Sequence, residues 1–150
     1  MLKGISPLLI PDLLALLCDM GHGDEIIIAD ANFTARSLAQ GKPVVRLPGA
    51  GVLQVVQAVM PLFPLDRAVD QPVTFMQVCQ LPPGDTSQVQ RDVIQALAAS
   101  GETTAAGCQA LERFAFYERC RSAFAVIHTG EMQPYANFIL KKGVIADALA

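Results

Sequence analysis

The chain has 150 residues, of which 52% are hydrophobic and 17% are charged, so it has the length of one domain and ample material for one core. Its net charge of -3, with 11 scattered lysines and arginines, provides no basic stripe for the phosphates of a nucleic acid. The segment Met1–Pro7 resembles neither a signal peptide nor a membrane span, because Asp12 and Asp19 interrupt the apolar residues that follow it. We therefore expect a single domain over residues 1–150, in the cytoplasm, with neither nucleic acid nor a membrane as its partner.

The first predicted elements are a helix over residues 11–20, a turn and a strand. Pro11 and Asp12 suit a helix N-terminus, since proline has no N–H to leave unpaired and aspartate favours the positive helix end. We expect Gly21 to end this helix in a left-handed conformation. Residues 25–30 form an apolar run without alternation, which is typical of a strand buried on both faces. The turn between them therefore joins a helix to a central strand.

The rest of the chain alternates between helix and strand patterns. Helical spacing or a capping-box pattern predicts the further helices, and short apolar runs predict the further strands. Helices are expected at residues 51–62, 87–99 and 111–121, and strands at residues 44–46, 73–78, 124–127 and 138–141. This alternation implies a three-layer α/β domain whose mainly parallel or mixed central sheet is flanked by helices.

The four cysteines lie far apart and form no C-x-x-C pair, so neither a structural zinc motif nor a dithiol redox motif is present. In a reducing compartment we expect free thiols and no bound metal. Cys18 and Cys79 lie within apolar stretches, which favours small core residues over nucleophiles.

His22 is a candidate proton-transfer group, because it lies between two glycines just after the first predicted helix. The missing side chains of Gly21 and Gly23 let a ligand approach the backbone closely. Histidine can donate or accept a proton near neutral pH. An exposed histidine that interacts with the helix C-terminus explains the local pattern as well, so both interpretations stay open.

Asp30 is a candidate binding residue, because it ends the strand predicted at residues 25–30, and open α/β sheets bind ligands at this edge. Its carboxylate suits sugar hydroxyls, but it also suits a cap on the following loop through Asn32. Asp24 and Glu25 lie closer to His22 along the chain, and a carboxylate in such a place can orient a histidine.

The helix predicted at residues 111–121 places Arg113, Phe116 and Tyr117 on one face. Phe116 is expected in the core. The planar guanidinium of Arg113 suits a polyol, and a solvated arginine is the alternative. Glu118 and Arg119 are expected to form an exposed charged face.

The loop of residues 129–137 links two predicted strands and concentrates hydrogen-bonding groups, as binding loops do. Tyr135 offers an aromatic face and a hydroxyl, and Asn137 offers both donors and an acceptor for sugar hydroxyls. An ordinary turn with common Pro, Asn and Gly preferences is the alternative interpretation.

Several of these segments together resemble the fucose mutarotase and ribose pyranase family of small sugar-handling proteins. The resemblance is close at both ends of the chain and weaker in the middle. The matching segments are Ile5–Leu8, Met20–Ile26, Arg113–Arg119, Thr129–Glu131 and Leu140–Val144, with Met60–Phe63 and Leu65–Asp66 as the best match in the middle. The segment Arg113–Arg119 resembles the fucose branch, whereas Ala136 resembles the ribose branch, and the longer segment favours L-fucose.

The resemblance implies an α/β fold assembled into a ring-shaped decamer, with active sites near subunit contacts. It implies that His22 is the proton donor. It also implies substrate-binding roles for Asp30, Arg113, Tyr135, Ala136 and Asn137.

The resulting hypothesis is a mutarotase that interconverts the α and β anomers of a monosaccharide through acid- and base-assisted ring opening. Such proton transfers need neither a metal nor an organic cofactor. One alternative is a ribose pyranase, which interconverts the pyranose and furanose forms of D-ribose through the same open-chain intermediate. The other is a non-catalytic sugar-binding ring, which needs Asp30, Arg113 and Tyr135 but not a titrating His22.

Overall fold

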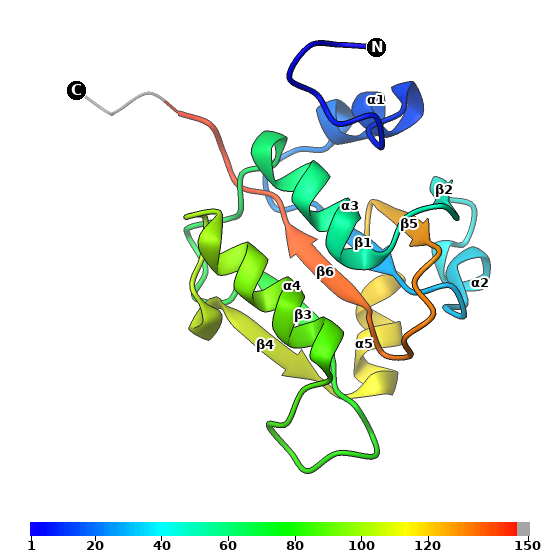
Figure 1. The fold of residues 1–150 in the computed structure, drawn as a ribbon, viewed down its shortest axis with the longest axis vertical. Coiled ribbons are helices and arrows are strands. Elements are labelled where there is room, and N and C mark those ends of the chain that lie inside the picture. The colour runs from blue at the N-terminus through cyan, green and yellow to red at the C-terminus, as the bar shows by residue number, and fades with distance from the viewer. Residues whose placement is uncertain (147–150) are drawn as a thin grey trace.

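The apolar runs become neighbouring strands of one six-stranded sheet in the computed structural model, which describes residues 1–146 (Figure 1). The strand order is β2-β5-β1-β6-β3-β4. The strands are β1 (Glu25–Ala29), β2 (Val44–Leu47), β3 (Val73–Met76), β4 (Cys108–Leu111), β5 (Ala125–Thr129) and β6 (Phe138–Lys141). β6 runs antiparallel to β1 and β3, and the other pairs are parallel. The expected mixed, mainly parallel sheet is therefore confirmed.

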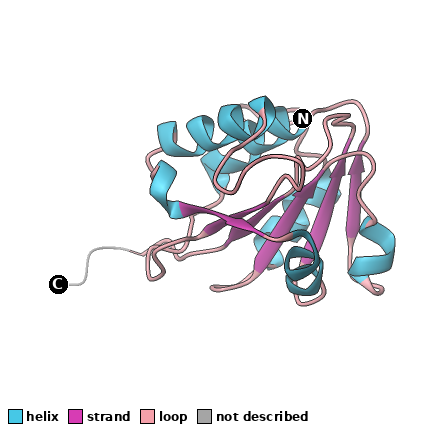
Figure 2. Ribbon diagram, turned by 90° about the horizontal axis from the view of Figure 1, so that it is seen from below, coloured by secondary structure: helices cyan, strands magenta, loops and turns pink. Residues whose placement is uncertain are grey.

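Helices cover both faces of the sheet and complete three layers (Figure 2). One face carries α1 (Pro11–Asp19), α3 (Val52–Val59) and α4 (Gln88–Ala99), and the other carries α2 (Ala35–Ala39) and α5 (Arg113–Cys120). Short 3-10 turns, η1 (Met60–Leu62) and η2 (Ala105–Gly107), follow α3 and precede β4. Within residues 1–146, none of the helices has the length and apolar character needed to cross a membrane.

Successive side chains of β1 enter opposite cores, because side chains alternate along a strand. Ile26 and Ile28 pack beneath α1, α3 and α4, whereas Ile27 and Ala29 pack against α2 and α5. All four are fully buried. This confirms that residues 25–30 contain a central strand buried on both faces, with Asp30 just beyond its end.

The end of α1 differs from the prediction. Met20 is extended, and it is Gly23, with φ of 85°, rather than Gly21 that adopts the left-handed conformation. The side chain of Lys142 reaches the end of the helix, where Nζ donates to the carbonyls of Leu17 at 2.7 Å and Met20 at 2.5 Å. A lysine from a distant segment therefore satisfies carbonyls that we expected a glycine turn to satisfy.

The sequence pattern misses α2 and β4. With only five residues, α2 is too short to show a helical period. β4 lies at the edge of the sheet, and none of its side chains is fully buried, so it lacks an apolar run. The helix predicted from Leu111 begins two residues later, because Leu111 is the last residue of β4.

The prediction that Cys18 and Cys79 are core residues is wrong, since both are exposed. All four cysteines are free thiols in the described structure. Burial raises the pKa of Cys108 to about 11 and that of Cys120 to about 12. These two thiols therefore stay protonated and unreactive at neutral pH.

Candidate active site

The predicted substrate-binding residues gather at one edge of the sheet. Parallel strands end on the same side, and β6 enters the sheet from that side because it runs in the opposite direction. Asp30 follows β1, Arg113 opens α5 directly after β4, and Tyr135, Ala136 and Asn137 precede β6. Open α/β sheets usually bind ligands at this carboxyl edge.

Asp30 and Asn137 are both buried, and they bind each other. Nδ2 of Asn137 donates to Oδ2 of Asp30 at 2.8 Å, and the backbone N–H of Asp30 donates to Oδ1 of Asn137 at 2.9 Å. Oδ1 of Asp30 also accepts the backbone N–H of Asn32 at 3.0 Å, so the expected loop cap is present. Burial raises the pKa of the Asp30 carboxyl, although its hydrogen bonds with Asn137 and Asn32 oppose the rise.

The backbone of Tyr135 adopts a left-handed conformation with φ of 64°, which is uncommon for a residue other than glycine. Nε2 of Gln90, on α4, donates to the carbonyls of Tyr135 at 2.9 Å and Met76 at 2.7 Å. Nε2 of Gln80 donates to the Tyr135 hydroxyl at 3.0 Å, and Ala136 is fully buried. Gln90 therefore supports the binding loop, a role that its capping-box position did not suggest.

Arg113 supplies an unused hydrogen-bond donor. Its Nε is buried and has no partner among the described residues, and its guanidinium carbon lies 4.7 Å from the centre of the Phe114 ring. An unsatisfied buried donor costs about 1–3 kcal/mol, and more when it is charged. A ligand that accepts this hydrogen bond would relieve the cost, which makes Arg113 a candidate binding residue.

Tyr117 lies among these groups, on the helical face that the sequence pattern assigned to it. Its ring packs 5.9 Å from that of Phe33, centre to centre. Burial raises the pKa of its hydroxyl, and Asp30, Arg113 and Tyr135 lie near enough to influence it. The Tyr117 hydroxyl therefore lies near charged and polar groups of the carboxyl edge.

Arg119 is not part of an exposed charged face, which corrects the prediction. Its guanidinium donates to both carboxylate oxygens of Glu25, at 3.1 and 2.6 Å, and to the buried hydroxyl of Thr74 at 2.7 Å. Paired donors to one carboxylate fix both side chains in a plane. This contact joins α5 to β1 and β3, and it therefore fixes the helix that carries Arg113 and Tyr117.

His22 lies at the edge formed by the amino-terminal ends of the parallel strands, opposite the carboxyl edge that carries the other predicted residues. It precedes β1, whereas Asp30 follows β1, and a strand of five residues spans roughly 17 Å at about 3.3 Å per residue. The side chain is 54% exposed, and Nε2 lies 3.3 Å from Oδ1 of Asp66. One chain alone therefore does not bring His22 to the carboxyl edge.

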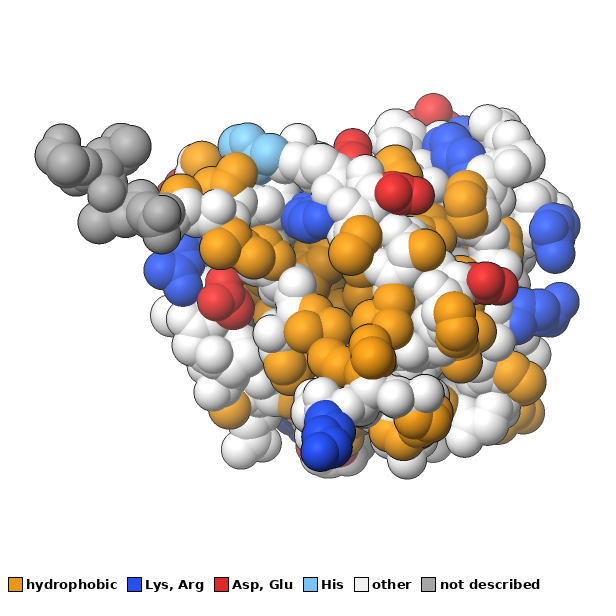
Figure 3. All heavy atoms as spheres, turned by 90° about the horizontal axis from the view of Figure 1, so that it is seen from above, with side chains coloured by type: hydrophobic (Ala, Val, Ile, Leu, Met, Phe, Trp, Pro, Cys, Tyr) orange, Lys and Arg blue, Asp and Glu red, His pale blue; other side chains and the backbone are white. Residues whose placement is uncertain are grey.

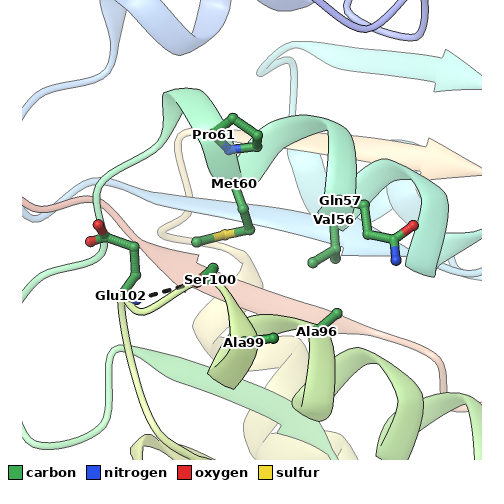
Figure 4. A pocket seen from close by; sticks show the side chains of 8 residues that line it. All are labelled: Val56, Gln57, Met60, Pro61, Ala96, Ala99, Ser100 and Glu102. Atoms are coloured by element: carbon green, nitrogen blue, oxygen red, sulfur yellow. Dashed lines mark hydrogen bonds between the residues drawn. The ribbon is translucent and has the colours of Figure 1, made fainter.

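A hollow of about 480 Å³ lies between α3 and α4, and neither Asp30 nor His22 lines it (Figure 4). It is lined by Val56, Gln57, Met60, Pro61, Ala96, Ala99, Ser100 and Glu102. No predicted site residue borders it, so this hollow is not part of the candidate site. Among residues 1–146, His, Cys, Asp and Glu side chains nowhere form a group of three that could hold a metal ion.

The fold and the carboxyl edge define a small α/β protein with a candidate polar site beside a mainly parallel sheet. Residues 3–145 match the family described as the RbsD / FucU transport protein family, and the chain belongs to this family. The match includes the middle of the chain, where the resemblance of individual motifs is weak.

Curated relatives are similar along nearly their whole length. The L-fucose mutarotase of Actinobacillus pleuropneumoniae is 42% identical over 147 residues, which cover 96% of this chain and 97% of the relative. The fucose mutarotase of Homo sapiens is 44% identical over 149 residues, covering 97% of this chain and 95% of the relative. The crystal structure of the fucose mutarotase of Streptococcus pneumoniae in complex with L-fucose matches with a TM-score of 0.88 and 39% identity, covering 97% of this chain and all of that one.

Proposed function

We propose that this protein is a cofactor-independent mutarotase that interconverts the α and β anomers of L-fucose. The observation that carries the proposal is the buried Nε of Arg113, which has no partner among the described residues, at the same edge of the sheet as the Asp30–Asn137 pair. A charged donor and a carboxylate at one edge suit the hydroxyls of a neutral monosaccharide, which both donate and accept. The likeness to relatives named as fucose mutarotases supports fucose as the sugar.

Each group at the carboxyl edge has a role in this proposal that follows from its chemistry. The Asp30 carboxylate accepts hydrogen bonds from sugar hydroxyls, and Arg113 donates to them. Tyr135, Ala136 and Asn137 fix the orientation of the sugar ring. The rigid support of this loop by Gln90 and of α5 by Arg119 keeps these groups in place before the sugar arrives.

The chemistry is the opening and closing of a cyclic hemiacetal. A proton is given to the ring oxygen as its bond to the anomeric carbon breaks, and the anomeric hydroxyl passes its proton to water as the aldehyde forms. Rotation of the aldehyde and closure on its other face reverse these transfers and yield the other anomer. We assign the proton given to the ring oxygen to His22, since a positioned acid or base contributes typically ~10²–10⁴ in rate.

The position of His22 requires a second subunit in this proposal. A head-to-tail contact brings the His22 edge of one copy against the Asp30 edge of the next. Such contacts form a closed ring when the rotations between successive copies add up to a full turn. The ring-shaped decamer implied by the family resemblance is a ring of this kind. The sites would then lie between subunits.

An apolar surface near α1 supports subunit contact. Figure 3 shows hydrophobic side chains gathered on this face. Exposed apolar side chains that line two hollows beside α1 contribute, namely Leu2, Ile10, Leu62 and Ile145. Contiguous exposed apolar surface commonly marks an interaction site. Sedimentation of the purified protein tests the decamer, and a monomer at the concentration of the activity assay would contradict it.

Exchange NMR on the anomeric protons of L-fucose tests the activity directly. We expect accelerated exchange with the wild-type protein and a fall toward the uncatalysed rate in His22→Ala. Arg113→Lys should weaken fucose binding roughly 10–100-fold, because a hydrogen bond involving a charged group contributes about 1.5–3 kcal/mol. Arg121→Lys, at an exposed arginine paired with Glu118, is the matched control.

The same assay separates the alternatives. Faster exchange with D-ribose than with L-fucose would favour the ribose pyranase, for which Ala136 is the supporting residue. Tight sugar binding without accelerated exchange would favour the non-catalytic ring. A cytoplasmic location also stays a prediction, and fractionation of the source cells tests it.

A further inference from the structure

The imidazole of His22 contacts a carboxylate to which the sequence patterns assigned no role. Nε2 of His22 lies 3.3 Å from Oδ1 of Asp66. The Asp66 side chain is 5% exposed, whereas that of His22 is 54% exposed. One ring nitrogen is therefore held by a buried carboxylate, while more than half of the side chain stays open to a ligand.

The two carboxylates that closely follow His22 in sequence, Asp24 and Glu25, bind other groups. Oδ2 of Asp24 accepts the backbone N–H of Gly21 at 2.7 Å, within the turn itself. Both carboxylate oxygens of Glu25 accept hydrogen bonds from Arg119. Asp66 is thus the carboxylate that meets the histidine ring.

Backbone hydrogen bonds hold the two partners at a set distance. The N–H of Gly23 donates to the carbonyl of Lys142 at 2.8 Å, and the N–H of Lys142 donates to the carbonyl of Asp24 at 2.8 Å. The N–H of Asp66 donates to the carbonyl of Lys141 at 3.0 Å. The turn of His22 and the segment of Asp66 are therefore both fastened to the end of β6. A contact supported in this way is preorganised.

The protonation of the pair follows from the surroundings of Asp66. The backbone N–H of Ala68 donates to Oδ1 at 3.0 Å and, with the hydrogen bond from His22, holds the pKa of the Asp66 carboxyl below its usual value. An ionised carboxylate only accepts hydrogen bonds. Nε2 of His22 must therefore carry a proton, and Nδ1 of the neutral ring carries the free electron pair.

We propose that Asp66 is a positioning residue that holds Nε2–H of His22, so that Nδ1 is the atom that exchanges protons with the sugar. This inference rests on the proposed function, in which His22 is the acid. In the imidazolium form both ring nitrogens carry a proton, and the proton on Nδ1 moves to the ring oxygen as the bond from that oxygen to the anomeric carbon breaks, which leaves the free electron pair on Nδ1. On ring closure, the same proton returns to Nδ1. The Asp66 carboxylate holds the ring in one orientation and one tautomer, as a carboxylate does behind other catalytic histidines.

The first test is Asp66→Asn, which keeps the size of the side chain and an oxygen for the N–H of Ala68 but removes the charge. We expect kcat for anomer exchange to fall about 10–100-fold, the range found when a supporting hydrogen-bond partner is removed. KM should change little, because Asp66 does not touch the sugar. Arg67→Gln is the control, since this neighbouring charge is exposed and pairs only with Glu102 among the described residues.

A double-mutant cycle separates positioning from general stability. If Asp66 acts through His22, Asp66→Asn has no further effect on exchange in the His22→Ala background. A second readout is the Nε2–H proton of His22 in the NMR spectrum. We expect a protected signal in the wild type that exchanges with water several-fold faster in Asp66→Asn. Thermal unfolding of each variant confirms that it is folded, and Asp66→Glu replaces the asparagine variant if that one is not.

The outcomes distinguish the two proposals. Unchanged exchange in His22→Ala would overturn the catalytic assignment and, with it, this inference. Loss of exchange in His22→Ala, together with a fully active Asp66→Asn and an unchanged Nε2–H signal, would overturn the inference alone. An equal loss from Asp66→Asn in both backgrounds would show a structural role rather than positioning of His22.

Discussion

Asn137 and Asp30 lie 107 residues apart in sequence and hold each other by two hydrogen bonds of opposite direction. One joins the side-chain amide to the carboxylate, and the other joins the backbone N–H of Asp30 to the amide oxygen. The pair joins the end of β1 to the start of β6 and fixes the position of the buried carboxylate.

Replacing Asn137 by alanine should therefore lower both stability and sugar affinity. The change leaves a buried N–H and a buried carboxylate oxygen without this partner, at about 1–3 kcal/mol for each unsatisfied group. Urea unfolding measures the free energy, and titration with L-fucose measures binding. Asn32→Ala is the control, because Asn32 donates to Asp30 through its backbone and keeps that bond. Equal stability losses in the two variants would contradict the account.

The two buried aspartates should affect stability in opposite directions as the pH changes. The pKa of Asp30 is raised, so its ionisation costs stability, and this cost appears as the pH rises through the raised pKa. The pKa of Asp66 is lowered, so its contribution is present above its ordinary value of 3.8 and is lost as the pH falls through the lowered pKa.

Urea unfolding from about pH 3 to pH 7 tests these opposite pH dependences of the free energy of unfolding. As the pH rises, the wild type should lose stability relative to Asp30→Asn and gain stability relative to Asp66→Asn. Any constant offset from altered hydrogen bonds leaves these slopes unchanged. If the stability differences of both variants from the wild type changed with pH in the same direction, the direction of one of the two pKa shifts would be wrong.

Gln90→Met should loosen the binding loop. The variant keeps the length of the side chain but leaves the carbonyls of Tyr135 and Met76 without its donor, so we expect a loss of about 1–3 kcal/mol. Weaker fucose binding should accompany the loss, because the left-handed conformation of Tyr135 is no longer held. Gln88→Met, at an exposed position of the same helix, should change neither thermal stability nor binding.

Gly143→Ala should disturb the segment that holds Asp66. A Cβ atom at this position would lie 2.4 Å from the carbonyl oxygen of Leu65 and 2.9 Å from Cα of Asp66, so the backbone must shift. Overpacking of this kind typically costs about 1–3 kcal/mol. Calorimetry should show a lowered Tm, and the NMR signals of His22 should move. Gly49→Ala is the control, since open space surrounds its Cβ position.

Some elements were predictable from the sequence because their signals are local. The central strand at residues 25–30 is an unbroken apolar run, and the capping box of Ser87 and Gln90 is present with hydrogen bonds of 3.3 and 3.0 Å. β4 gave no such signal, because an edge strand with half-exposed side chains has the composition of a loop. Its existence depends on pairing with β3, a contact that local patterns do not contain.

The same distinction applies to the candidate site. Local patterns and family resemblance selected Asp30, Arg113 and the loop Tyr135–Asn137, and the antiparallel direction of β6 explains why they share one edge. The predicted strand at residues 25–30 already separated His22 from Asp30, whereas the strand order and directions that bring Arg113 and the loop Tyr135–Asn137 to the Asp30 end came only from the structure.

The sequence by itself supplied the candidate residues for the chemistry, because glycine turns, strand ends and helix faces follow from neighbouring residues. Only the tertiary structure decided which carboxylate meets His22. Asp24 and Glu25 follow His22 closely in sequence, yet they bind Gly21 and Arg119, and the contact belongs to Asp66, 44 residues away. The physical reason is that the end of β6 joins two distant segments through backbone hydrogen bonds, and such pairing depends on the whole sheet rather than on any local pattern.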